Sequence, residues 1–154
     1  MSVQDRLTDD LKTAMKARDE LTRDVVRLAI SAIKTAEIDK RGALDAAGVT
    51  DVLSRMVRQH RESIVAFRDG GREAAAAKEE AELAIVMRYL PEQLGPGEIR
   101  ALAQAAAAEV GASGPSDRGK VMGKLMPQLR GRADGAVVST AVGEVLDAMA
   151  PPSA

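Results

Sequence analysis

Apolar residues recur at intervals of three and four positions along almost the whole 154-residue chain, and no segment alternates convincingly with a period of two. This spacing places the apolar side chains on one face of an α-helix, whereas a half-buried strand would need strict alternation. A first helix is marked by Val3, Leu7, Leu11 and Met15, and a second by the apolar positions between Val25 and Ala36, among them Leu28. The sequence therefore predicts an all-α protein.

Turn-forming residues divide the N-terminal part of this pattern into four helices. Thr22 is the expected N-cap of the second helix. The segment 42–50 is expected to be a loop, and the third helix to end at Gly70–Gly71. A fourth helix is expected to begin near Arg72 and to run through strong helix formers to Leu90.

The stretch PEQLGPG, residues 91–97, holds two prolines and two glycines and is the best candidate for a link between domains. Three shorter helices follow it, the second after Pro115–Ser116 and the third capped by Asp134. We expect a four-helix, bundle-like N-terminal domain and a smaller three-helix C-terminal domain. The expected boundaries are 1–92, 93–150 and a disordered tail at 151–154.

Composition restricts the core and the class of protein. Phe67 and Tyr89 are the only aromatic residues, so the core must be built from aliphatic side chains and methionine. The formal net charge is −1, which gives no general attraction to nucleic acid or to anionic membranes. The chain has no cysteine, no signal-like start and no apolar run of membrane-spanning length. We expect a cytoplasmic protein without a membrane partner.

The stretch GKVMGKLMPQLRGRADG, residues 119–135, resembles a nucleotide-binding loop at first sight. A Walker loop has four residues between its glycines, and a serine or threonine after its lysine. Here three residues separate Gly119 from Gly123, and Leu125 follows Lys124. Helical spacing also continues through the stretch, so the nucleotide-loop interpretation fails. The two glycines are better interpreted as small residues that let another helix approach closely.

The second half of the same stretch predicts a junction between two helices. Pro127 lacks a backbone donor, so the helix is expected to kink or restart there. Gly131 is a natural C-cap for this helix and Asp134 a natural N-cap for the next.

Basic residues gather in the same region. Within fifteen positions they are opposed only by Asp117 and Asp134, whereas the rest of the C-terminal part is acidic apart from Arg100. This asymmetry is typical of a local phosphate-binding patch, although charge alone favours a solvated helix face. The candidate nucleic-acid-binding residues are Arg118, Lys120, Lys124, Arg130 and Arg132.

The other polar residues show no chemistry of their own. A weaker basic cluster, Arg55, Arg58 and Arg61, lies on the third helix beside acidic neighbours. His60, the only histidine, is interpreted as a structural residue at the border of the core. The carboxylates lie among lysines and arginines, as in solvated helix faces. We expect no catalytic residue, no metal site and no cofactor.

Four runs together resemble the GatB/YqeY family, and in particular its free-standing YqeY-like proteins. They occur in the order of the family, and the resemblance extends over nearly the whole chain: RLAISAIKTAEID (27–39), RQHRESIVAFRDGGRE (58–73), AELAIVMRYLPEQL (81–94) and GKVMGKLMPQLRGRADGAVV (119–138). The resemblance implies the same architecture, an N-terminal helical bundle followed by a three-helix unit.

The C-terminal unit is similar to the tail of the B subunit of the tRNA-dependent amidotransferase, which converts Glu-tRNA(Gln) or Asp-tRNA(Asn) to the amide form with glutamine and ATP. In that complex the tail engages tRNA, and the chemistry occurs in other domains. This chain lacks a counterpart of the catalytic part, and no catalytic residue can be transferred to it. His60 also departs from the family, whose members tend to carry a basic residue there.

Three hypotheses follow. The first is an accessory protein that binds tRNA or another structured RNA and works with a tRNA-processing or aminoacylation complex. The second is participation in carbon–nitrogen ligation with glutamine as amide donor, as a partner subunit and not as an enzyme by itself. The third is a protein–protein adaptor that uses exposed apolar surface and has no role with RNA.

Overall fold

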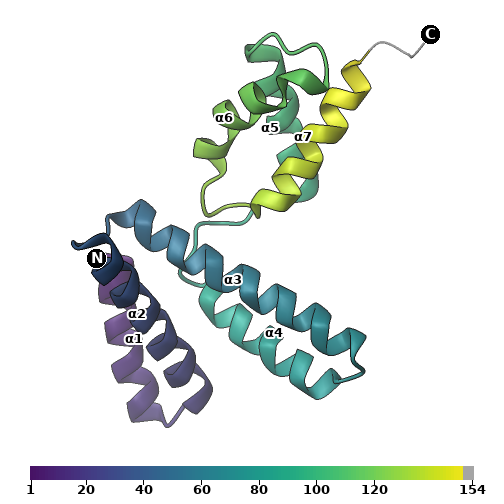
Figure 1. The fold of residues 1–154 in the computed structure, drawn as a ribbon. Helices are drawn as coiled ribbons and strands as arrows, with labels where there is room; N and C mark the ends of the chain where they lie inside the picture. The colour runs from purple at the N-terminus through teal and green to yellow at the C-terminus, as the bar shows by residue number, and fades with distance from the viewer. Residues whose placement is uncertain (151–154) are drawn as a thin grey trace. The chain divides into compact units, whose positions relative to one another are not determined.

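The protein is helical throughout the part described by its structure, a computed structural model that describes residues 1–150. These residues form seven α-helices and one short 3-10 helix and contain no strand, so the all-α prediction is confirmed (Figure 1). The chain forms two compact units, of which the first is Met1–Leu90 and the second begins at Pro91. The tail expected at 151–154 lies outside the described residues.

Four α-helices form the first unit, and three α-helices with one 3-10 helix form the second. In the first unit they are α1 (Val3–Ala17), α2 (Glu20–Lys40), α3 (Ala46–Asp69) and α4 (Glu73–Met87). In the second unit they are α5 (Pro96–Glu109), η1 (Pro115–Asp117), α6 (Arg118–Leu129) and α7 (Gly135–Met149).

The N-terminal unit consists of two antiparallel hairpins, α1–α2 and α3–α4 (Figure 1). Helix α2 joins the two hairpins, because it contacts both helices of the second hairpin, α3 and α4. Of these two helices, α1 contacts only α3. The hairpins diverge toward their closed turns, as the purple and teal pairs in Figure 1 show. The shared core is aliphatic apart from Tyr89 and includes Leu7, Val26, Ile33 and Leu53.

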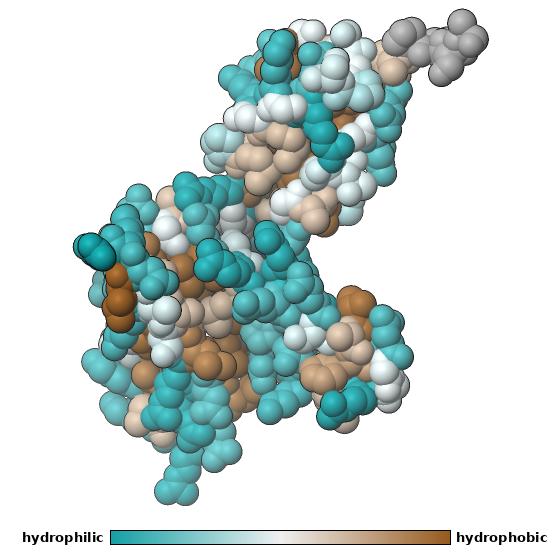
Figure 2. All heavy atoms as spheres, viewed as in Figure 1, coloured by the Kyte–Doolittle hydropathy of each residue, from teal (hydrophilic) through white to brown (hydrophobic). Residues whose placement is uncertain are grey.

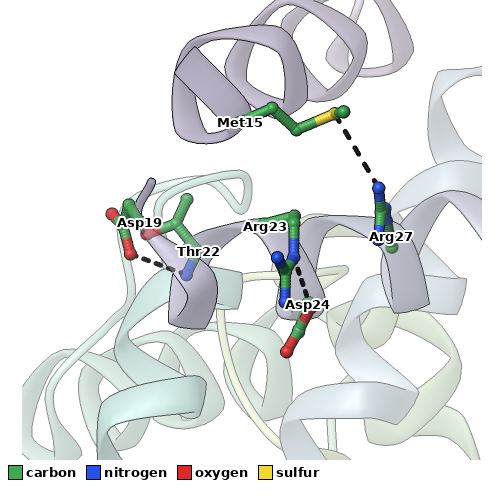
Figure 3. A network of polar contacts seen from close by, with 6 residues as sticks. All are labelled: Met15, Asp19, Thr22, Arg23, Asp24 and Arg27. Atoms are coloured by element: carbon green, nitrogen blue, oxygen red, sulfur yellow. Dashed lines mark hydrogen bonds and ion pairs between the residues drawn. The ribbon is translucent and has the colours of Figure 1, made fainter. Parts of the chain in front are cut away.

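Divergence of the hairpins leaves apolar side chains accessible on this unit (Figure 2). Met15 and Leu28, expected on the inward faces of the first two helices, are more than half exposed. Leu28 lies to the side of the buried stripe that includes Val25, Ala29 and Ile33. Met15 instead receives a weak contact from Arg27 across the α1–α2 hairpin, with Nη2 at 3.8 Å from the sulfur (Figure 3).

The cap of α2 differs from the sequence expectation. Asp19, not Thr22, is the N-cap, and its carboxylate accepts the backbone N–H of Thr22 at 3.1 Å (Figure 3). Both residue types cap helices, so the pattern did not distinguish them. Arg18 ends α1 in the left-handed conformation at φ 57°, which lets the chain reverse before Asp19.

Two further helix ends differ from the prediction. Helix α3 begins at Ala46, inside the expected loop 42–50, because the Asp45 carboxylate accepts the N–H of Gly48 at 2.8 Å. Helix α4 ends at Met87, three residues before Leu90. Residues that form helices well lie on both sides of Ala46 and of Met87. Helix propensity alone therefore could not locate the start of α3 or the end of α4.

Tyr89 fastens the end of the first unit to α1. Its buried ring lies under the Arg6 guanidinium, 5.2 Å from the ring centroid. Its hydroxyl donates a short hydrogen bond to Asp10, and Arg6 donates to the carbonyl of Arg88 at 3.0 Å. Burial raises the pKa of Tyr89, and the hydrogen bond to Asp10 raises it further, so the phenol stays protonated as a donor.

The C-terminal unit has its own core between α5, α6 and α7. Each helix contributes a stripe of small or aliphatic side chains, and the fully buried ones include Ala103, Val121, Leu125, Val138 and Val142. No described aromatic side chain belongs to this core, so the helices approach each other through alanine, valine and leucine.

The segment before α5 is bound to the C-terminal unit and does not form a free link. The backbone N–H of Leu94 donates to the carbonyl of Arg132 at 2.9 Å. The side-chain amide of Gln93 donates to the carbonyl of Gly131 at 2.7 Å. Helix α4 ends at Met87 and Pro96 is already the first residue of α5, so the irregular stretch is 88–95 and not the predicted 91–97.

Replacement Tyr89→Phe is expected to lower the free energy of unfolding of the N-terminal unit by about 1 kcal/mol, because Asp10 loses its donor. Urea titration followed by far-UV circular dichroism measures the effect. In a double-mutant cycle, Asp10→Asn should have much less effect once Tyr89 is phenylalanine. Additive losses would show that the hydroxyl and the carboxylate are not coupled.

Candidate nucleic-acid interface

Helix α6 carries the centre of the candidate patch and buries only one of its faces. Val121, Leu125 and Leu129, spaced by four residues, are fully buried against the unit core. On a helix of 3.6 residues per turn, Gly123 and Pro127 fall on the side opposite to this stripe. The patch residues of α6 are therefore arranged around a helix whose outer side is accessible.

The glycines of α6 do not serve the contact predicted from the sequence. A Cβ atom added to Gly119 or to Gly123 would meet no other atom within 4 Å. No helix in the described residues approaches them, so the helix-contact interpretation is wrong for this chain. Without side chains at these positions, the main chain of α6 is open to an external partner.

The helix passes through Pro127 and ends two residues later, without restarting. The donor that proline lacks falls in the last turn, where little of the helix remains to be disturbed. Arg130, and not the predicted Gly131, is the C-cap, and Gly131 follows it in the left-handed conformation at φ 75°. Asp134 is the N-cap of α7, as predicted, and accepts the N–H of Ala136 at 2.7 Å.

Arg118 faces α7 and not the outer side of α6. Its Nη2 donates to the carbonyl of Ser139 at 3.0 Å and to the hydroxyl of the same residue. Gly143 leaves room for the guanidinium, because a Cβ there would lie 3.1 Å from Nη1. Arg118 thus ties α6 to α7, and its charge is partly engaged by neutral acceptors of its own unit.

Lys120 and Lys124 are one helical turn apart on an accessible side of α6, with 73% and 47% of their side chains exposed. Each ammonium has one carboxylate nearby: Lys120 lies 3.9 Å from Asp117 and Lys124 lies 3.5 Å from Glu109. The backbone N–H of Ser113 lowers the pKa of Asp117, so this carboxylate stays ionised at neutral pH.

Arg130 and Arg132 lie in the turn between α6 and α7. Arg130 is exposed, directly after the last residue of α6. Arg132 is half-buried, and its Nε lies 3.4 Å from the carbonyl of Glu92, which accepts a long hydrogen bond. The turn is therefore held against the chain segment that precedes α5.

The five candidate residues thus occupy three places in one unit. Lys120 and Lys124 share a side of α6, Arg118 lies against α7, and the two turn arginines follow the end of α6. The weaker cluster of Arg55, Arg58 and Arg61 lies exposed on α3, in the other unit.

One group of residues that the sequence did not single out is brought together in the N-terminal unit. His60 on α3 lies beside Glu79 and Glu82 on α4, and one ligand atom of each lies within 4.8 Å of the other two. His60 does border the core, as predicted. The available signal was the three-residue spacing of the two glutamates, but their histidine partner depends on the register of two helices.

Among the described residues, no helix combines the length and the apolar character that crossing a membrane requires.

Comparison with known proteins gives one family and a set of curated relatives. The model of the family described as Yqey-like protein matches residues 4–146. The protein named altered inheritance of mitochondria protein 41, mitochondrial, is 38% identical over 85 residues in Eremothecium gossypii and in Lachancea thermotolerans. The protein of the same name in Saccharomyces cerevisiae is 36% identical over 85 residues. Each alignment covers 54% of this chain and 46% of the relative, so the matched part is about half of either protein.

The expected cytoplasmic location is contradicted by these comparisons, because all three relatives are named as mitochondrial proteins. The expectation depended on the absence of cysteine and of long apolar runs. Those properties describe a chain suited to an aqueous compartment, and the interior of an organelle is also aqueous. Composition therefore could not identify the compartment.

Two alanine substitutions test the positions of the glycines around the patch. Gly131→Ala should destabilise the C-terminal unit by about 1 kcal/mol, because it forces a Cβ into a positive-φ conformation. Gly123→Ala should stabilise it by about 0.5–1 kcal/mol, because the site is helical and has open space. Thermal unfolding measured by circular dichroism compares them, and shifts of the same sign would contradict this assignment.

Proposed function

The chain belongs to the Yqey-like protein family, and on that premise we propose that it is an accessory protein that binds structured RNA, with tRNA as the first candidate. The contact surface is the accessible side of α6 with the turn that follows it. The observation that carries this proposal is a glycine-faced helix, open to solvent at Gly119 and Gly123, with Lys120 and Lys124 on an accessible side.

The charge distribution supports a local contact on a protein of nearly neutral charge. The formal net charge of the chain is −1, so long-range attraction to RNA is weak. Within the C-terminal unit, however, the basic residues concentrate in α6 and in the turn after it. Such a patch binds phosphates over a short range and positions a partner without reading its sequence.

The ion pairs of the two lysines do not prevent such a contact. The Lys124–Glu109 pair is solvent-exposed on both sides, whereas Lys120 is 73% exposed and its partner Asp117 only 18%. Both pairs are longer than a direct hydrogen bond, at 3.9 Å for Lys120 and 3.5 Å for Lys124. Exposed pairs of this kind contribute little to stability, because water solvates both charges well. Each lysine can therefore exchange its carboxylate for a phosphate at small cost.

The bare main chain between the basic residues favours close approach of a backbone. A phosphate or ribose can reach the surface of α6 at Gly119 and Gly123, where any larger residue would hold it away. Phe67 and Tyr89, the only aromatic residues, both belong to the other unit. Base stacking has no platform on α6, so recognition depends on backbone and shape.

The choice of tRNA depends on the resemblance of the C-terminal helices to the tRNA-engaging tail of the amidotransferase B subunit. Because the curated relatives are matched over about half of their length, their own functions add nothing to this choice.

The open glycine face favours one alternative, a protein partner whose helix packs against α6. Small residues on a helix surface admit a second helix as readily as a nucleic-acid backbone. The two functions differ in their dependence on RNA. Co-purification with a protein partner that persists after nuclease treatment would favour the adaptor, whereas loss of the partner would favour RNA.

Charge reversal tests the proposed interface. The double variant Lys120→Glu/Lys124→Glu should weaken tRNA binding strongly, and the slope of log affinity against log salt should fall by about two. The matched control is Lys12→Glu/Lys16→Glu, which makes the same charge change with the same spacing on α1. Filter binding over a range of salt concentrations measures both. If both variants lost the same amount of tRNA affinity, the effect would be due to net charge alone, and the proposed site would be wrong.

Steric blocking tests the glycine face without a change of charge. Gly123→Gln places a polar side chain over the open main chain and should weaken tRNA binding several-fold, while Gly123→Ala should have a smaller effect. Both variants keep every lysine and favour the helix relative to glycine. Unchanged binding by Gly123→Gln would show that the partner does not approach α6 closely.

A further inference from the structure

The contact between α3 and α4 contains the only histidine of the chain together with two carboxylates. His60 projects from α3 toward α4, where Glu79 and Glu82 are separated by one helical turn. The two helices lie side by side in an antiparallel hairpin (Figure 1). Facing helices of a bundle are a common framework for metal sites, in which each helix contributes ligands to a shared point.

The three side chains converge on one imidazole nitrogen. His60 Nδ1 lies 2.6 Å from Glu79 Oε2 and 3.8 Å from Glu82 Oε2. The other oxygen of Glu82 faces Lys78, with Nζ at 4.0 Å from Oε1. Glu82 therefore directs one oxygen outward to a lysine and the other inward to the histidine.

The limited exposure of the two glutamates to water strengthens their attraction for a cation. The side chains of His60, Glu79 and Glu82 are 13%, 23% and 17% exposed, so they border the core but retain access to water. Charges in such a position attract a counter-ion more strongly than on an open surface. Lys78 lies beside Glu82, with Nζ 4.0 Å from Oε1, and supplies one positive charge to the two carboxylates at long range.

We propose that His60, Glu79 and Glu82 bind one zinc-class divalent cation that joins α3 to α4. The ion replaces the proton between His60 Nδ1 and Glu79, and the proton moves to solvent. The neutral imidazole then keeps its remaining hydrogen on Nε2. Three protein ligands leave one position of a tetrahedral site for water.

The distances suit a small tetrahedral ion. Zinc bonds of about 2.0–2.1 Å to nitrogen and oxygen place neighbouring ligand atoms roughly 3.3 Å apart. The two observed separations from Nδ1, 2.6 Å and 3.8 Å, lie on either side of that value. Insertion of the ion therefore needs Glu79 to move outward and Glu82 to move inward by a fraction of an ångström each.

The ligand set favours zinc and similar first-row metals over the alkaline-earth ions. Imidazole suits zinc, cobalt and nickel, whereas calcium and magnesium take mainly oxygen ligands and higher coordination numbers. Two carboxylates with one imidazole nitrogen provide too few oxygens for calcium. Because the ligands come from two helices, binding should also stabilise the hairpin.

The test uses the full chain, freed of metal by a chelator and titrated with zinc sulfate in competition with a chromophoric chelator. We expect one zinc ion per chain and a rise in the melting temperature of the N-terminal unit. His60→Gln and Glu79→Gln should weaken binding by at least the roughly 10–100-fold seen when a supporting partner of a ligand is removed. Glu80→Gln is the matched control, since Glu80 is adjacent in sequence but pairs with Arg68.

Nitrogen NMR gives a second readout that does not depend on the variants. The single histidine gives one imidazole spin system, so a shift at Nδ1 on addition of zinc identifies the ligand atom directly. Zinc in several-fold excess that leaves this resonance unchanged, or binding of equal strength in His60→Gln, would overturn the proposal. The contact between His60 and Glu79 would then be a plain hydrogen bond.

Discussion

Close contact between helices that carry small aliphatic side chains is the interaction on which both units depend. Within residues 1–150, every side chain that forms the two cores is aliphatic except Tyr89, and none of the buried residues is charged. Cores of alanine, valine and leucine stabilise through area and density, and they define helix register only by shape. The polar contacts of Asp19, Asp45 and Asp134 therefore mark the beginnings of α2, α3 and α7.

Much of this fold could be predicted from the sequence, because the spacing of apolar residues and the positions of turn-forming and capping residues are local signals. The all-α class, the helices on either side of Gly70–Gly71 and the capping role of Asp134 follow from such signals. The predictions were wrong where more than one residue type can play the same structural role. Thr22 and Asp19 are both good caps, and Arg18 ends a helix in a conformation that glycine would have indicated.

The candidate site was less predictable, since its arrangement depends on contacts between helices. Sequence identified the basic residues of α6, but it could not show that Arg118 points to Ser139 while Lys120 remains exposed. The glycines of α6 were assigned to a helix contact, although their spacing from Val121 and Leu125 already placed them away from the buried stripe. The meeting of His60 with Glu79 required the pairing of α3 with α4, which no local pattern encodes.

The position of Tyr89 has an optical consequence. The chain contains one tyrosine and no tryptophan, so almost all of its near-ultraviolet absorbance and intrinsic emission comes from a single buried phenol. That phenol lies at the end of the first unit, where it donates to Asp10 of α1. The C-terminal unit has no tyrosine or tryptophan and is nearly silent in such spectra. The tyrosine signal of the unlabelled protein therefore reports the opening of its N-terminal helices alone.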